Sequence, residues 1–216
     1  MPLARQGRPR FRAVIFDLDE TLLLRARAWQ YAVEQAVASV TGQRVDAGPL
    51  AGEYRHRPWE HALGVLLADS RDAARCAALC GEMFYRSGMK RLLVHEGLGM
   101  ALDQLRAGRV EIGAISREQH RIARHQIESA GLERFVGALS GTPEGAVWAP
   151  AARAAGCLAF FEYRAADCVF VSGEASDLRA AAEAGFVCLE AGWATSEPSG
   201  FPQISRPADL PALAAP

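Results

Sequence analysis

The stretch RAVIFDLDETLLL, residues 12–24, decides the fold of this chain. Residues 13–16 are a continuous apolar run rich in β-branched and aromatic side chains, which is typical of a strand buried on both faces of a parallel sheet. The run ends on two carboxylates, Asp17 and Asp19. Because side chains at i and i+2 of an extended chain point the same way, both should project from the carboxyl edge of the sheet, where open α/β sheets bind ligands.

The closeness of Asp17 and Asp19 limits what the site can be. Two adjacent carboxylates are difficult to keep ionised without a cation, so the pair indicates either bound Mg²⁺ or one protonated member. A plain acidic junction between strand and loop is the alternative. An apolar strand that ends in Asp-x-Asp-x-Thr is a tight and unusual pattern for such a junction, and it favours a functional site.

The segment Asp17-Leu-Asp-Glu-Thr21 resembles the first motif of the haloacid dehalogenase (HAD) superfamily of aspartyl-nucleophile phosphotransferases. The resemblance implies that Asp17 is the nucleophile that attacks phosphorus to form an aspartyl-phosphate. Asp19 would be the general acid/base that protonates the leaving oxygen and later activates water. Thr21 would be a hydroxyl that helps to orient the loop.

Composition places the chain among ordinary globular proteins. It has 216 residues, half of them hydrophobic, and a formal net charge of −1, which suggests neither nucleic-acid binding nor a membrane surface. No apolar run is long enough to span a bilayer, and the basic N-terminus lacks an apolar segment, so we expect a cytoplasmic protein. The five cysteines form no Cys-x-x-Cys pair and are interpreted as small buried hydrophobes rather than metal ligands.

The sequence after the first strand predicts a helical insertion. Helices are expected over residues 22–40, 60–67 and 70–84, the last with Ser70 as its N-cap. Between residue 42 and about residue 91, no stretch is typical of a strand. A helical block at this place resembles the cap of the C1-capped branch of the superfamily, which closes over the site and supplies specificity. Arg25, Arg27, Arg57 and Trp59 are candidate cap residues for reading a phosphosugar or a carboxylate.

The predicted fold class is therefore α/β, a Rossmann-like three-layer parallel sheet with an inserted α-helical cap. Residues 11–24 and 92–216 would form the core, 25–91 the cap, and 1–10 a loose leader. In the core, strands are expected at 110–115, 135–139, 167–171 and 187–189, helices at 98–106, 118–129 and 178–185, and loop from residue 195 with a final turn near 209–214.

Two of the later segments resemble the second and third motifs of the superfamily. The strand at 110–115 stops at Ser116-Arg117, and the resemblance gives Ser116 a hydrogen bond to a phosphoryl oxygen, to which Arg117 could add a cation. Thr142 stands where the third motif has a lysine that neutralises the nucleophile and the phosphoryl group. Lys90, the only lysine, lies far away in the sequence, at the end of the insertion, and cannot be assumed to compensate. Arg117 or Arg153 could, although an arginine has a different geometry and is no simple replacement for lysine.

The loop Ser172-Gly-Glu-Ala-Ser-Asp177 resembles the fourth motif, whose two acids hold Mg²⁺. Asp177 fits the second acid. The first acid is either Glu174, one residue closer than usual, or absent, because an alignment without gaps places Gly173 there. The implied metal ligands are thus Asp17, Asp19, Glu174 and Asp177.

The resemblance implies a Mg²⁺-dependent phosphatase of a small phosphorylated metabolite, acting through Asp17. Thr142 and the altered fourth motif favour an alternative, a catalytically weakened relative that binds a ligand or partner in the same cleft. A dehalogenase-like hydrolase, in which Asp17 attacks carbon without metal, is the third hypothesis; Asp19 and the missing lysine count against it. Neither a nucleic acid nor a membrane is expected as a partner, and a homodimer stays open.

Overall fold

The computed structural model describes residues 10–50, 60–195 and 198–214. It divides into two compact units, one made of Met1–Leu22 and Val94–Pro216 and the other of Leu23–Leu93. The corresponding predicted ranges were 11–24 with 92–216, and 25–91. Most of the predicted leader, residues 1–9, lies outside the described part of the chain.

The first unit is built on a six-stranded parallel sheet in the order β5-β4-β1-β6-β7-β8. The strand bounds are β1 (Ala13–Asp17), β4 (Glu111–Ser116), β5 (Ala138–Gly141), β6 (Cys168–Ser172), β7 (Val187–Ala191) and β8 (Gln203–Ile204). All five residues of β1 are buried, as the continuous apolar run predicts for a central strand. The prediction of a parallel α/β sheet is confirmed.

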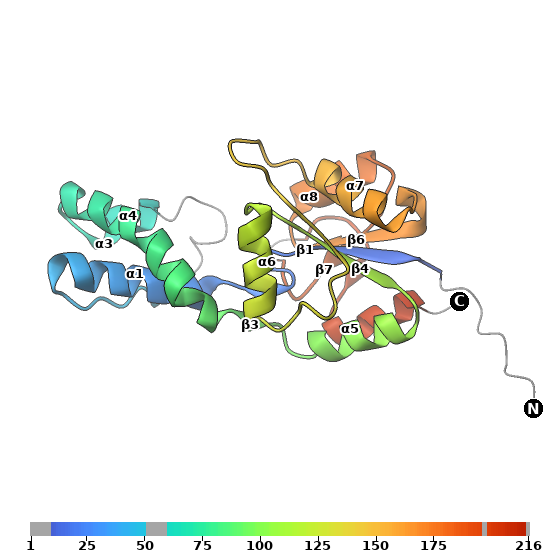
Figure 1. Cartoon of the computed structure of the whole chain (residues 1–216), viewed down its shortest axis with the longest axis horizontal. Coiled ribbons are helices and arrows are strands. Elements are labelled where there is room, and N and C mark those ends of the chain that lie inside the picture. Colours follow the sequence, from blue (N-terminus) through green and yellow to red (C-terminus); the bar gives the residue numbers. More distant parts are fainter. Residues whose placement is uncertain (1–9, 51–59, 196–197, 215–216) are drawn as a thin grey trace, which may run out of the picture. The chain divides into compact units, whose positions relative to one another are not determined.

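Helices cover both faces of this sheet and make three layers. In Figure 1, α7 and α8 lie on one side, while α5 and the C-terminal 3₁₀ segment η4 lie together on the other. The helix bounds are α5 (Leu98–Ala107), α6 (His120–Ser129), α7 (Pro150–Phe161), α8 (Ala175–Glu183) and η4 (Pro207–Ala214), and a short 3₁₀ turn, η3 (Ala165–Asp167), precedes β6. The predicted three-layer, Rossmann-like arrangement is therefore present.

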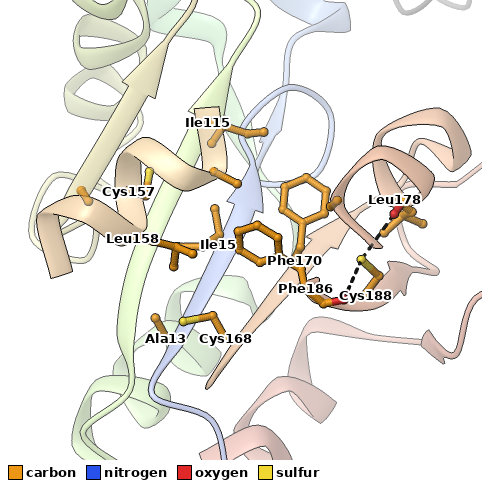
Figure 2. Close-up of a cluster of buried hydrophobic side chains, with 13 residues drawn as sticks. Ala13, Ile15, Ile115, Cys157, Leu158, Cys168, Phe170, Leu178, Phe186 and Cys188 are labelled. Carbon is orange, nitrogen blue, oxygen red and sulfur yellow. Dashed lines mark hydrogen bonds between the residues drawn. The ribbon is translucent and has the colours of Figure 1, made fainter. Parts of the chain in front are cut away.

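The core under α7 and α8 follows from the register of the central strands. Ala13 is paired with Cys168 and Ile15 with Phe170, so alternate residues of β1 and β6 face the same layer. Figure 2 shows these side chains packed with Leu158 of α7 and others of the cluster. Their burial holds β1 in the middle of the sheet and fixes where its carboxyl end lies.

The second unit consists of helices around a small core of its own. Trp29 stacks on Phe84 with ring centroids 4.1 Å apart, joining α1 to α4. Cys76 and Cys80 are buried in the same packing, which agrees with their interpretation as small hydrophobes. The elements are α1 (Ala26–Thr41), η1 (Gly48–Leu50), α3 (Glu60–Leu66), α4 (Ser70–Arg86) and η2 (Gly88–Arg91).

Two local predictions about the second unit are corrected. The first helix begins at Ala26 rather than at residue 22, because Leu23–Leu24 forms β2, which pairs with β3 (Leu93–Val94). The N-cap of α4 is Asp69 and not Ser70. The Asp69 side chain accepts hydrogen bonds from the backbone N–H groups of Arg71 and Asp72.

Two predictions about the sheet are also corrected. The strand expected at 135–139 is β5, which starts at Ala138, because Phe135 lies in a turn closed by its N–H bond to the carbonyl of Leu132. The tail contains β8, which pairs with β7, where only loop was predicted. Within the described residues, no helix combines the length and apolar character needed to cross a membrane.

Candidate active site

The carboxyl ends of β1, β4 and β6 place three polar side chains next to one another. Asp17 ends β1, Ser116 ends β4 and Ser172 ends β6, and all three are almost completely buried. The strand order reverses at β1, with β4 and β5 on one side and β6 to β8 on the other, and open α/β sheets bind ligands at such a point. The predicted ligand-binding edge therefore contains buried polar groups in an otherwise apolar sheet.

Asp17 and Asp19 lie together, as their spacing predicts. The backbone N–H of Asp19 donates to Oδ1 of Asp17 over 3.3 Å, and the Ser172 hydroxyl donates to Oδ2 over 3.4 Å. Asp19 in turn accepts the backbone N–H of Arg117 at 3.1 Å and lies 3.4 Å from the Ser116 hydroxyl. Both carboxylates are thus positioned by neighbouring strand ends.

The loop after β1 is fixed by contacts from distant parts of the first unit. The hydroxyl of Thr21 accepts the backbone N–H of Gly173 at 3.2 Å. The carbonyl of Thr21 accepts the indole N–H of Trp193 at 3.0 Å, and Nε2 of His95 lies 2.9 Å from the carbonyl of Glu20. Glu20 itself adopts a left-handed φ of 61°, so these contacts hold a tight turn behind the two aspartates.

Thr142 is used to support the loop after β4. It is 7 % exposed, and its hydroxyl donates to the carbonyl of Ser116 over 3.0 Å. Its backbone N–H donates to the carbonyl of Glu118 over 2.8 Å. Thr142 therefore lies beside the predicted site through Ser116, but it brings no positive charge there.

Asp177 accepts hydrogen bonds from three side chains, the weakest from the Ser176 hydroxyl at 3.4 Å. Nη2 of Arg117 reaches its Oδ2 at 2.9 Å, and the indole N–H of Trp148 donates to its Oδ1 at 3.0 Å. The Arg117 guanidinium also lies over the Trp148 ring, 4.6 Å from the centroid. Burial raises the pKa of Asp177, the charge of Arg117 and the Trp148 hydrogen bond oppose this effect, and nearby Glu174 adds to it.

Steric crowding explains why a glycine follows Ser172. A Cβ on Gly173 would lie 2.8 Å from the backbone carbon and oxygen of Ala194, closer than real Cβ contacts come. No acidic side chain can therefore occupy position 173 without moving the segment after β7. Glu174 precedes α8 as its N-cap residue and remains the candidate for the first acid of this loop.

Comparisons with known proteins can now be set beside this geometry. No protein-family model and no curated protein sequence matches the chain. Solved structures do match. A HAD-superfamily hydrolase of subfamily IA, variant 1, from Geobacter sulfurreducens superposes with a TM-score of 0.79 at 18% identity, covering 99% of this chain and 100% of the other. The chain has the HAD fold.

Two further solved structures show how widely functions vary on this HAD fold. One, described as a predicted phosphoglycolate phosphatase from Haemophilus somnus, has a TM-score of 0.72 at 15% identity over 94% of this chain and 98% of the other. The other, protein tyrosine kinase A from Mycobacterium tuberculosis, has a TM-score of 0.66 at 22% identity over 91% and 94%. At such identities the likeness establishes the fold and leaves the activity to be argued from the site.

The donor set suits Mg²⁺ in part. Asp17 and Asp19 offer the hard carboxylate oxygens that Mg²⁺ takes, and this ion commonly uses only one or two carboxylates together with substrate phosphate and water. Asp177 is instead engaged by Arg117 and Trp148. Among the described residues, no three His, Cys, Asp or Glu side chains gather closely enough to hold a metal ion. The four-carboxylate set stays a prediction, and Asp17 with Asp19 is the part that the geometry favours.

Sequence reasoning missed the residues that support the site. Ser172, Trp148, Trp193 and His95 were given no role in it, although each contacts a predicted site residue or its loop. Tryptophan occurs only four times in the chain, and two of these residues lie in loops at the carboxyl edge, a signal that could have been used. Of the candidate cap residues, Arg57 and Trp59 lie outside the described ranges.

Proposed function

We propose that this HAD-like chain is a hydrolase, and specifically a Mg²⁺-dependent phosphatase of a small phosphorylated metabolite. The observation that carries the proposal is Asp17, a carboxylate 1 % exposed at the end of the central strand, with Asp19 hydrogen-bonded beside it. Burying a carboxylate is costly unless its charge is used or compensated, so such a pair at the ligand-binding edge favours a catalytic role.

In the proposed reaction, an oxygen of Asp17 attacks phosphorus, and the bond from phosphorus to the ester oxygen breaks. Asp19 gives its proton to the leaving oxygen, so the alcohol departs neutral. Asp19 then takes a proton from water, whose oxygen attacks the aspartyl-phosphate and releases inorganic phosphate and Asp17. Asp19 would carry this proton on one oxygen and offer the other to Mg²⁺, which, held also by Asp17, would neutralise the charge on the phosphoryl oxygens.

The deciding experiment measures phosphate release from an aryl phosphate and a panel of phosphorylated metabolites. Wild type and Asp17→Asn are compared, each with Mg²⁺ and with chelator. We expect turnover to require both Asp17 and Mg²⁺, with Asp17→Asn at least about 10³-fold slower because the nucleophile is lost. The change is isosteric, so an unaltered melting temperature serves as the control. Turnover that survives in Asp17→Asn would refute the role given to Asp17.

A second function is favoured by Thr142 and by the engagement of Asp177. A site whose third motif is neutral and whose fourth-motif acid is tied to an arginine has features of a weakened relative that binds a ligand without turning it over. No phosphate release from any compound of the panel, by a folded protein that also binds no Mg²⁺, would favour this function over the phosphatase.

A further inference from the structure

Asp177 lies in the first turn of α8 and is 2 % exposed. Both of its oxygens accept hydrogen bonds: Oδ2 from the guanidinium of Arg117, and Oδ1 from the indole of Trp148 and the hydroxyl of Ser176. These donors occupy most of the roughly four lone-pair positions of the carboxylate, so a metal ion bound to Asp177 would compete with them for what remains. The guanidinium is a cation already, so Asp177 has a counter-ion within the protein itself.

Arg117 contacts the predicted site through both its backbone and its side chain. Its backbone N–H donates to Asp19, and its side chain joins Asp177 while lying over Trp148. The side chain is nevertheless 42% exposed. A guanidinium has about five N–H donors, and the ion pair uses one of them, so others remain available to an anion from solvent.

The charges around the predicted nucleophile require such a cation. Asp17, Asp19 and Asp177 are acidic, and a phosphoryl group would add more negative charge, while Thr142 is neutral. Arg117 contacts Asp19 through its backbone and Asp177 through its side chain, which places its charge beside the predicted site.

We propose that Asp177 acts as a positioning residue for Arg117 rather than as a metal ligand, and that Arg117 provides the cation for the bound phosphoryl group. Mg²⁺ then depends on Asp17 and Asp19. The part that concerns phosphoryl binding rests on the proposed function; the part that concerns Asp177 and the metal does not.

Mg²⁺ binding, measured by calorimetry on the full chain, tests the role of Asp177. We expect Asp177→Asn to change the Mg²⁺ dissociation constant by less than about twofold, whereas Asp17→Asn raises it about tenfold or more because a ligand is lost. Arg117→Gln frees Asp177 and should tighten Mg²⁺ binding several-fold. The double variant Arg117→Gln/Asp177→Asn should lose that gain, which separates a freed carboxylate from a general loss of positive charge.

Binding of inorganic phosphate tests the role of Arg117. Arg117→Gln should weaken it about tenfold, since a charge-assisted hydrogen bond to the anion disappears. Arg121→Gln is the matched control, because Arg121 is an exposed arginine of α6 close in sequence, and it should leave both affinities unchanged. Melting temperatures confirm that each variant is folded.

Three results would overturn the proposal: a tenfold loss of Mg²⁺ affinity in Asp177→Asn, a gain in Arg117→Gln that persists in the double variant, or phosphate binding that does not depend on Arg117. Failure of the phosphatase function would look different. A wild type that binds Mg²⁺ and phosphate as expected but releases no phosphate from any ester would refute the function and leave the Arg117–Asp177 pair standing.

Discussion

Thr142 is the residue at which the site departs most from the pattern that its sequence resembles. Its hydroxyl supports the carbonyl of Ser116, and its side chain is almost fully buried. If Arg117 already supplies the missing charge, a lysine at position 142 has little to add. We expect Thr142→Lys alone to change kcat/KM by less than about threefold, and to restore much of the activity lost in Arg117→Gln, since either cation can face the phosphoryl group.

Steady-state kinetics of both single variants and the double variant test this expectation. Thr142→Val is the control, because it removes the hydrogen bond to Ser116 without adding charge. A large gain from Thr142→Lys in the wild-type background would mean that positive charge limits the reaction and that Arg117 does not provide it.

Gly173 gives a prediction about stability. An added Cβ would collide with the backbone of Ala194, which cannot yield as a flexible side chain can. Gly173→Ala should therefore destabilise the protein by about 1–3 kcal/mol, the usual range for overpacking, in denaturant unfolding. Gly99→Ala is the matched control: it lies within α5 with open space around its Cβ, so alanine should be neutral or slightly stabilising there. Equal effects of the two changes would contradict the steric argument.

Among single residues, Asp17, Asp19 and Ser116 were predictable because each lies at the end of a strand, or two residues beyond it, and an apolar run in the sequence indicates that strand. The partners of Asp177 could not be predicted in the same way. Trp148 lies in a loop without periodicity, and its contact with Asp177 depends on how two segments 29 residues apart meet in space. Such contacts follow from tertiary packing, which local pattern does not encode.

Among the elements, long and strongly apolar strands were predictable and short ones were not. β1 and β6 are continuous hydrophobic runs, whereas β2, β3 and β8 have two residues each, too few to show a period. The start of β5 was predicted too early, because the apolar residues Phe135 and Val136 precede the strand and bond to the carbonyl of Leu132 instead of to a neighbouring strand. An apolar run therefore predicts that residues are buried, but it does not show whether they pair with a neighbouring strand.

The connection from β7 to β8 yields a prediction about acid stability. Glu190 of β7 is 2 % exposed and accepts hydrogen bonds from the backbone and hydroxyl of Ser199 and from the Gln203 amide. Burial alone would raise the pKa of Glu190, but these hydrogen bonds outweigh it and lower the pKa below its ordinary value of 4.5.

Because its pKa is lower in the folded state, Glu190 stabilises the fold above its unfolded pKa, and that stabilisation is lost as pH falls through the folded pKa. We expect wild type to melt above Glu190→Gln at pH 7, and the difference to shrink as pH falls below about 4. Melting curves of the two proteins across this range measure it. If the difference in melting temperature stays constant with pH, the charge of Glu190 does not contribute to stability.

For the whole molecule, the five buried thiols report on how the two units open. Cys157, Cys168 and Cys188 belong to the first unit, and burial raises their pKa to about 12, 11 and 11, so they are protonated at neutral pH. Cys76 and Cys80 are buried in the second unit. We expect no thiol to react rapidly with a disulfide reagent in the native protein, and all five to react on unfolding.

Mapping the labelled cysteines during a denaturant titration extends this test. If the second unit unfolds on its own, Cys76 and Cys80 will be labelled at lower denaturant than the other three. Simultaneous labelling of all five would show that both units unfold in one transition. Rapid labelling of any thiol in native buffer would contradict the burial described above.

The order of the motifs along the chain made the global fold predictable. Only a few α/β topologies can accommodate a strand with two aspartates, then a helical insertion, then two further strands with polar ends. The order of the motifs could not reveal how charges are arranged in the site, because Arg117, Asp177 and Trp148 come from segments far apart in the sequence that only the tertiary fold brings together.

The position of β1 also has a consequence for how the chain reaches its native state. Its neighbours β4 and β6 begin at residues 111 and 168, so this fully buried strand is synthesised long before either partner exists. A sheet assembled from such distant segments has high contact order and folds slowly. During translation, residues 13–16 are therefore an apolar segment without a strand partner. We expect a chaperone to bind the nascent chain at this segment rather than at the helical insertion.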